Sequence, residues 1–244
     1  LVDPENTRSL PKMVAACSGF DVLCHGIESY TALPFYKREA PPTPAHRPAY
    51  QGSNPISDVW ALAALELVGK NIVQAVLDDD YDARSNMALA ATFAGVGFGN
   101  AGVHLPHGMS YPVSSLVKKY RPEGYPEENA IVPHGMAVIL NAPAVFRYTA
   151  QSNPERHIHA ARLLGADISD AGPEDAGDVL SERIIEILQK IGAPNGLREL
   201  DYTPDDIPAL VEGTLPQHRV TKLAPRATGS EELYKLFNQS MQLW

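Results

Sequence analysis

The same four residues, Pro-His-Gly-Met, occur twice in this chain, at positions 106–109 and 133–136. Proline is well tolerated at the first position of a helix, because the amide it lacks would have no partner there. Each copy therefore predicts a helix start with His107 or His134 in the first turn, where the helix dipole disfavours a charged imidazolium. The glycine after each histidine removes side-chain bulk where two helix ends would have to converge. The repeat predicts two neutral imidazoles that helix packing brings to one centre.

An Asp-x-x-x-His pair, Asp21 and His25, lies upstream in the segment 15–30. Apolar residues recur there at helical intervals, so both side chains would leave one face of one helix. With His107 and His134 they supply one carboxylate and three imidazoles, a set that suits Fe(II) or Zn(II) better than Mg²⁺ or Ca²⁺. Spacing alone does not choose between the two metals. The plainer alternative is an ordinary i,i+4 pair and two histidines that only begin buried helices.

Composition and charge restrict the partners and the compartment of the chain. A net charge of −9 argues against nucleic acid or an anionic membrane as a partner. The longest uncharged apolar run is too short for a membrane span, and no signal or transit segment is visible. Cys17 and Cys24 are separated by roughly 10 Å along one predicted helix, which is too far for a disulfide. Reduced core thiols suit the cytoplasm, or the mitochondrial matrix if the organism is eukaryotic.

Helical periodicity dominates the sequence, and stretches with strand-like alternation are hard to find. With 44% hydrophobic residues, residues 1–244 are expected to form a single all-α metal-binding domain, a bundle of about eight helices. The strongest helix pattern, 56–77, would be capped by Asn54 or Ser57. The proline-rich segment 34–54 predicts a long irregular excursion, either a surface loop or a cleft wall or oligomer contact. Further helices are predicted at 84–98, 137–150, 155–164, 173–191 and 231–243.

Three segments carry a resemblance to a known family: SGFDVLCHGIESYT at 18–31, GFGNAGVHLPHGMSYP at 97–112 and VPHGMAVIL at 132–140. They resemble the helical metal-binding domain of iron-containing (group III) alcohol dehydrogenases, which is the C-terminal domain of the dehydroquinate synthase-like fold. The resemblance runs from about residue 2 to the C-terminus. It looks closest to the subgroup of hydroxyacid–oxoacid transhydrogenases.

The resemblance implies roles for particular residues. Its metal ligands map onto Asp21, His25, His107 and His134, the same four residues that the spacing selects, with Fe(II) or alternatively Zn(II) as the ion. It also places Phe98 near the nicotinamide of bound NAD(P). A homo-oligomer is implied as well.

Two departures from the family pattern matter. Many members carry a second histidine four residues after the third ligand, and here that position is Tyr111. A tyrosine hydroxyl could hydrogen-bond the substrate oxygen, although its ordinary pKa near ~10 makes it a poor base; alternatively Tyr111 only packs at the helix start.

The second departure concerns the nucleotide. Family members bind NAD(P) on an N-terminal α/β domain, and nothing in this chain fills that role. The segment 97–102 fits G-x-G-x-x-G in letters, but it follows an alanine-rich helical pattern rather than a strand. The main seat of the nucleotide is therefore expected outside these 244 residues, in a missing N-terminal half, and the fragment alone is expected to be inactive.

The predicted function is metal-assisted hydride transfer between a hydroxy acid or alcohol and nicotinamide. By resemblance, the substrates would be 4-hydroxybutyrate and 2-oxoglutarate, which give succinate semialdehyde and 2-hydroxyglutarate; the alternative is a simple alcohol. Arg219 or Lys222 could pair with a substrate carboxylate, although solvated surface is the default for such residues.

Two other classes of function stay open. A metallohydrolase would need a base near the ion, and Glu28 is the nearby carboxylate on that helix face. A non-catalytic, metal-stabilised oligomerisation module would need only the ligands. His104, three residues before His107, has no role by default but lies close to the predicted centre.

Overall fold

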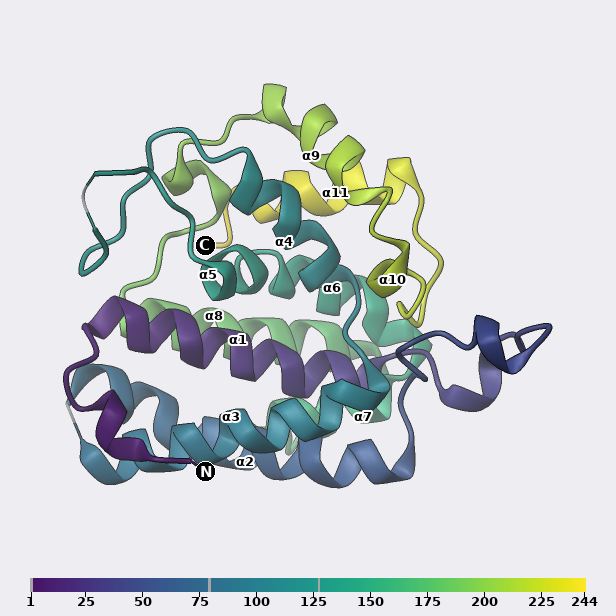
Figure 1. The fold of residues 1–244 in the computed structure, drawn as a ribbon, viewed down its shortest axis with the longest axis horizontal. Helices are drawn as coiled ribbons and strands as arrows, with labels where there is room; N and C mark the ends of the chain where they lie inside the picture. Colours follow the sequence, from purple (N-terminus) through teal and green to yellow (C-terminus); the bar gives the residue numbers. More distant parts are fainter. Residues whose placement is uncertain (1, 79, 127) are drawn as a thin grey trace.

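The computed structural model describes residues 2–78, 80–126 and 128–244, which form eleven α-helices and no strand. Helix labels follow Figure 1. The predicted all-α fold is confirmed, although the bundle contains more helices than the eight expected. Of the three additional helices, two (Ile207–Thr214 and His218–Thr221) are too short for periodicity to reveal them, and the third arises because the helix predicted at 137–150 is interrupted at residues 140–141. The helices are α1 (Lys12–Thr31), α2 (Pro55–Leu77), α3 (Tyr81–Ala101), α4 (Leu105–Ser115), α5 (His134–Ile139), α6 (Ala142–Thr149), α7 (Pro154–Leu163), α8 (Ala176–Ile191), α9 (Ile207–Thr214), α10 (His218–Thr221) and α11 (Ser230–Ser240).

The helices are stacked in layers around α1 (Figure 1). Helices α2 and α3 pack on one side of α1, and α5 packs on another side. Beyond them, α4 contacts α5 and α9, and α9 contacts α11. Phe20, Leu23 and Ile27 of α1 are completely buried, as expected for a helix that is covered on several faces. The central helix of the bundle is therefore also the helix that carries Asp21 and His25.

The start of α2 matches one of the two predicted caps. The Asn54 side chain accepts hydrogen bonds from the backbone N–H groups of Ile56 and Ser57, at 3.2 and 3.1 Å. By length and composition alone, α2 could cross a membrane, which the apolar run-length in the sequence did not predict. However, α2 packs against α1, α3 and α7, and the core helix of a globular domain has the same composition.

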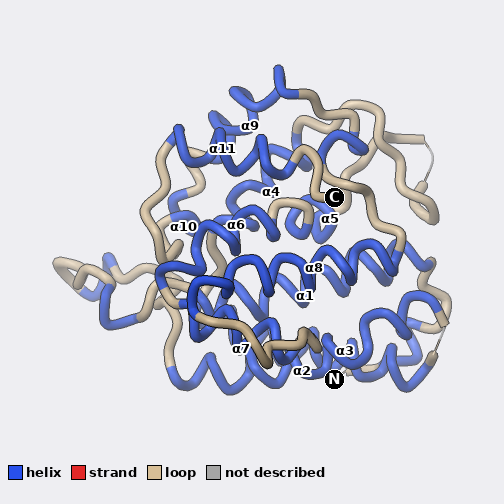
Figure 2. The backbone as a smooth tube through the Cα atoms, turned by 180° about the vertical axis from the view of Figure 1, so that it is seen from behind, coloured by secondary structure: helices blue, strands red, loops and turns tan. Residues whose placement is uncertain are grey.

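The segment between α1 and α2 projects from the body of the bundle as an irregular excursion (Figures 1 and 2). Two short 3-10 helices, Phe35–Lys37 and Pro44–His46, are its only helical turns. It returns to the bundle at the end of α3, where the N–H groups of Gln51 and Gly52 donate to the carbonyls of Asn100 and Ala101 at 2.8 and 2.9 Å. The predicted excursion is confirmed, and its returning end is fixed against the last turn of α3.

His157 on α7 is expected to make the fold sensitive to acid. Its Nδ1–H donates to the Asn153 carbonyl at 2.8 Å, and its Nε2 accepts from the Thr149 hydroxyl at 3.0 Å. Burial lowers the pKa of His157 to about 4. The unfolded chain therefore binds a proton between pH 6.5 and 4 that the folded chain does not, so stability falls as the pH falls through this window.

We expect His157 alone to lower the free energy of unfolding by about 2 kcal/mol between pH 7.5 and pH 5. Urea denaturation at both pH values, in chelator, measures the loss in the parent chain and in His157→Gln. The variant should lose about 2 kcal/mol less on acidification. Equal losses in both proteins would contradict the assignment.

Candidate metal centre

Three of the four predicted ligands meet where α1, α4 and α5 come together. The Asp21 Oδ1 lies 3.3 Å from His107 Nε2 and 3.6 Å from His134 Nε2. One ligand atom from each of these three residues lies within 4.8 Å of the other two. His107 is in the first turn of α4 and His134 begins α5, as the repeated tetrapeptide predicts.

His25 lies at the edge of this group. Its Nδ1 is 3.5 Å from Asp21 Oδ2, and its ring centroid is 4.4 Å from that of His107. Its ring also stacks on Phe98 of α3, at 4.0 Å and 20°. His25 is thus beside the other three residues without sharing their common centre, and its role as a fourth ligand stays a prediction.

Two buried atoms at the centre have no hydrogen-bond partner, Asp21 Oδ1 and His107 Nε2. The two atoms face each other at 3.3 Å without hydrogen-bond geometry, and this arrangement requires an explanation because buried polar atoms are nearly always satisfied in folded proteins. A divalent cation between them would satisfy both atoms, because each would present a lone pair to it. The donor set therefore fits a transition metal.

Glu28 holds His107 in place. The carboxylate is fully buried and accepts a hydrogen bond from His107 Nδ1–H at 2.5 Å. It also accepts from the backbone N–H groups of His104 and His107, at 2.8 and 3.3 Å. A partner on Nδ1 fixes the tautomer and leaves Nε2 free to bind a metal. Because both carboxylate oxygens are used in this way, Glu28 is not available as the base that a metallohydrolase would need.

Sequence reasoning missed this supporting role of Glu28. The signal was present, since residues 21, 25 and 28 fall on one helical face. His104, the other neighbour of the centre, is buried, and its Nε2 lies 3.1 Å from the Thr31 hydroxyl oxygen. Burial lowers the pKa of His104 to about 4, so it is a neutral group of the core beside the centre.

The electrostatics of the centre favour positive charge at His107. Burial alone would lower the pKa of His107, but the carboxylates of Glu28 and Asp21 raise it to about 9. Without a bound ion, two nearby carboxylates outweigh the helix dipole at His107, so the neutral imidazole expected in the metal-bound centre stays a prediction. Burial, with a smaller contribution from His107, lowers the pKa of His25 to about 4. A metal ion would replace the proton that this site attracts.

The glycines of the two tetrapeptides permit close approach, as predicted, although to neighbouring helices rather than to each other. A Cβ on Gly135 would lie 1.9 Å from the Cys17 carbonyl oxygen of α1. A Cβ on Gly108 would lie 2.7 Å from the Thr221 methyl group of α10. The start of α5 thus lies directly against α1 beside Asp21, and α4 lies against α10.

The remaining predicted site residues border the same region. The Tyr111 ring lies 6.3 Å from that of His134, nearly parallel to it. Residues 97–101 form the last turn of α3, and Gly102 ends the helix with a φ of +88°. The expected helix end is confirmed, and because a nucleotide-binding loop of this type follows a strand, the rejection of this segment as such a loop stays a prediction that the helix supports. The roles of Tyr111 and Phe98 stay predictions.

Known proteins share this fold and much of this sequence. The sequence profile of the Fe-containing alcohol dehydrogenase family, C-terminal, matches residues 49–241. The chain belongs to the iron-containing alcohol dehydrogenase family. One relative, the mitochondrial hydroxyacid-oxoacid transhydrogenase of Rattus norvegicus, is 56% identical to this chain over its whole length. The chain spans about half the length of the curated relatives it matches, 53% in the rat protein.

Solved structures of iron-containing alcohol dehydrogenases and their relatives agree with the fold. A 1,3-propanediol oxidoreductase superposes with a TM-score of 0.81 at 28% identity, covering 98% of this chain and 54% of that one. A sulfoacetaldehyde reductase from Bifidobacterium kashiwanohense in complex with NAD+ superposes with a TM-score of 0.75 at 25% identity, covering 99% and 54%. The helical bundle is the fold of the C-terminal domain of this family.

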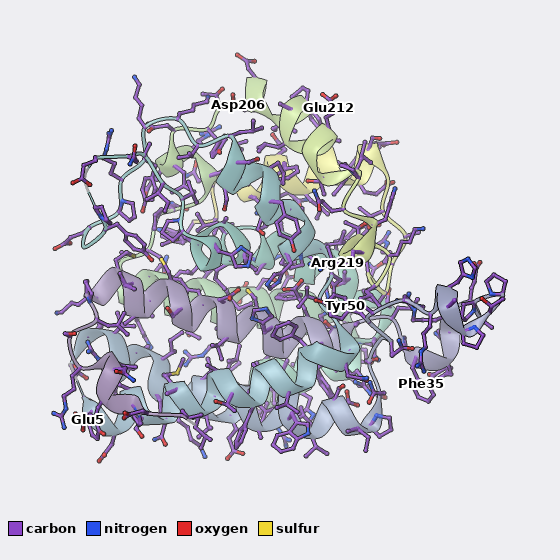
Figure 3. All side chains as sticks on the ribbon, viewed as in Figure 1. Glu5, Phe35, Tyr50, Asp206, Glu212 and Arg219 are labelled. Carbon is purple, nitrogen blue, oxygen red and sulfur yellow. The ribbon has the colours of Figure 1, made fainter. Side chains whose placement is uncertain are left out.

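Replacing Glu28 with glutamine is expected to weaken metal binding by about 10- to 100-fold, because the amide cannot accept from all three donors and hold the His107 ring. Glu212→Gln is the matched control, since Glu212 is exposed on α9 (Figure 3) and this helix contributes none of the three residues that converge on the centre. Competitive titration against a chromogenic chelator measures both affinities. Equal affinities would mean that Glu28 only fills the core.

Proposed function

We propose that this chain is the metal-binding half of an oxidoreductase that moves hydride between a hydroxy acid and an oxo acid through nicotinamide. The observation that carries the proposal is that Asp21 Oδ1 and His107 Nε2 are both buried without a hydrogen bond. A bound cation would satisfy both atoms. The 56% identity to the rat transhydrogenase supports the choice of reaction. The 28% identity to 1,3-propanediol oxidoreductase makes a simple alcohol the second candidate substrate.

In this proposal Asp21, His25, His107 and His134 hold Fe(II), with Zn(II) as the alternative. The bound ion supplies Lewis acidity, which favours the deprotonated form of a substrate hydroxyl and polarises a substrate carbonyl. Glu28 fixes the His107 ring through its Nδ1–H. The ring of Tyr111 lies beside that of His134, and in this proposal the Tyr111 hydroxyl donates a hydrogen bond to the substrate oxygen.

We propose that the main binding site for NAD(P) lies outside these 244 residues, in the N-terminal part of the longer protein. Phe98 would then border the nicotinamide, since it covers His25 at the end of α3. The complex of the structurally similar sulfoacetaldehyde reductase with NAD+ supports the cofactor class. We further propose residues 1–244 as one domain, assembled into a homo-oligomer.

The rat relative is named a mitochondrial protein. We therefore propose the mitochondrial matrix as the compartment in a eukaryote, and the cytoplasm otherwise. Buried thiols at Cys17 and Cys24 suit either reducing compartment.

The decisive experiment uses the full-length protein, loaded with Fe(II) without oxygen. Exchange of label from 4-hydroxybutyrate into 2-hydroxyglutarate, with 2-oxoglutarate present and no free NAD+ added, would support the transhydrogenase. Steady reduction of added NAD+ by an alcohol, without exchange, would indicate an ordinary dehydrogenase. Stabilisation by metal without turnover of any kind would leave only the non-catalytic module.

A further inference from the structure

Arg219 on α10 has no carboxylate partner among residues 2–78, 80–126 and 128–244. Other arginines of the bundle do have such partners: Arg156 is paired with Asp58, and Arg147 with Asp178. The guanidinium of Arg219 instead lies over the ring of Tyr50, at 5.5 Å from its centroid. Its charge is therefore left available to an anion.

Helix α10 connects Arg219 to the metal centre on one side. Thr221, one half-turn along α10, packs with its methyl group against Gly108 of α4. Gly108 directly follows His107, so the backbone that carries Arg219 is in contact with the helix turn that carries this ligand. Helices α10 and α4 are packed together along this contact.

Tyr50 connects Arg219 to the centre on the other side. The Cβ of Tyr50 lies 2.7 Å from the position that a Cβ on Gly102 would occupy. Gly102 donates its N–H to the Phe98 carbonyl at 2.7 Å, and Phe98 stacks on His25. Figure 3 shows Arg219 and Tyr50 as neighbours between α10 and α3. Arg219 is thus on a helix that packs beside the turn carrying His107, and its aromatic partner Tyr50 packs at the end of the helix that carries Phe98.

We propose that Arg219, oriented by the Tyr50 ring, binds the carboxylate of the hydroxy acid and of the oxo acid. Arginine suits this task because its planar fork matches a carboxylate and its face stacks on an aromatic ring. A chain with a net charge of −9 repels an anionic substrate unless a cation receives it. The inference rests on the proposed function, since a simple alcohol would not need such a group.

The test compares Arg219→Gln and Arg219→Lys with Arg226→Gln in the full-length, metal-loaded protein. Arg226 is a matched control, because its guanidinium also lies over a tyrosine, Tyr148, at 4.2 Å, and bonds the Tyr148 carbonyl. Arg219→Gln should raise the KM and the Kd for 4-hydroxybutyrate by roughly 10- to 100-fold, since a charge-assisted bidentate contact is lost. The kcat/KM for 1-butanol, which lacks the carboxylate, should not change.

Arg219→Lys should show an intermediate loss, because the charge is kept without the fork. Arg226→Gln should leave both substrates unaffected, and metal content should be the same in all variants. An unchanged Kd for 4-hydroxybutyrate in Arg219→Gln, or an equal loss with 1-butanol, overturns the inference while the proposed function stands. A parent protein that neither binds nor oxidises 4-hydroxybutyrate overturns both.

Discussion

His107→Ala is expected to reduce metal affinity by at least about 100-fold, because structural zinc sites in small peptides draw about 10–16 kcal/mol of binding free energy from four ligands, and the variant removes one predicted ligand. His107 is the predicted ligand with the most support in the structure, because its Nε2 faces Asp21 Oδ1 at 3.3 Å and Glu28 holds its other nitrogen. After metal loading and dialysis, the full-length His107→Ala protein should retain neither the ion nor the oxidoreductase activity. Elemental analysis after dialysis, and thermal unfolding with and without chelator, measure the loss.

The control for this variant is His46→Ala. His46 lies in the exposed excursion, where its Nδ1 is 2.8 Å from the Thr43 hydroxyl oxygen. The His46→Ala protein should retain as much metal as the parent protein does. If His107→Ala also retained one tightly held ion per chain, the centre would have to lie elsewhere.

Gly135→Ala is expected to destabilise the chain by about 3 kcal/mol, the upper part of the range for overpacked positions. The added Cβ would be 1.9 Å from the Cys17 carbonyl oxygen, and backbone cannot move aside as a flexible side chain can. Because the start of α5 must shift, His134 should also leave Asp21, and metal affinity should fall in parallel. Urea denaturation of the metal-free chain measures the first effect, and chelator competition measures the second.

Gly95→Ala is the matched control for this glycine. A Cβ on Gly95, in the interior of α3, would have no heavy atom within 4 Å. Alanine should therefore stabilise α3 by about 0.5–1 kcal/mol through its helix propensity. A Gly135→Ala chain as stable as the parent would show that α5 and α1 can separate without cost.

Local patterns predicted the parts of the site that depend on one element at a time. Spacing placed Asp21 and His25 on one face of α1, and the proline of each tetrapeptide placed His107 and His134 at helix starts. The contact of Glu28 with His107 was not predicted, because it joins residues 79 positions apart and depends on how α4 approaches α1. The short helices α9 and α10 were missed because one or two turns give no readable period.

The stacking of Arg219 on Tyr50 belongs to the same class of long-range contact. Sequence reasoning named Arg219 or Lys222 as a candidate partner of a substrate carboxylate, but it offered no basis for choosing between them. Its contact with Tyr50 depends on the return of the excursion onto the end of α3, which no local pattern describes.

The three groups that converge on the centre come from α1, α4 and α5, which are far apart along the chain. While the chain is being synthesised, only part of the donor set is available to cellular metal until His134 has left the ribosome. Tight uptake of the ion must therefore wait until the bundle has closed, and bound metal then favours the closed form by mass action. Metal occupancy thus reports completed packing of these three helices, and depriving a cell of the metal should enrich loosely closed, protease-sensitive molecules.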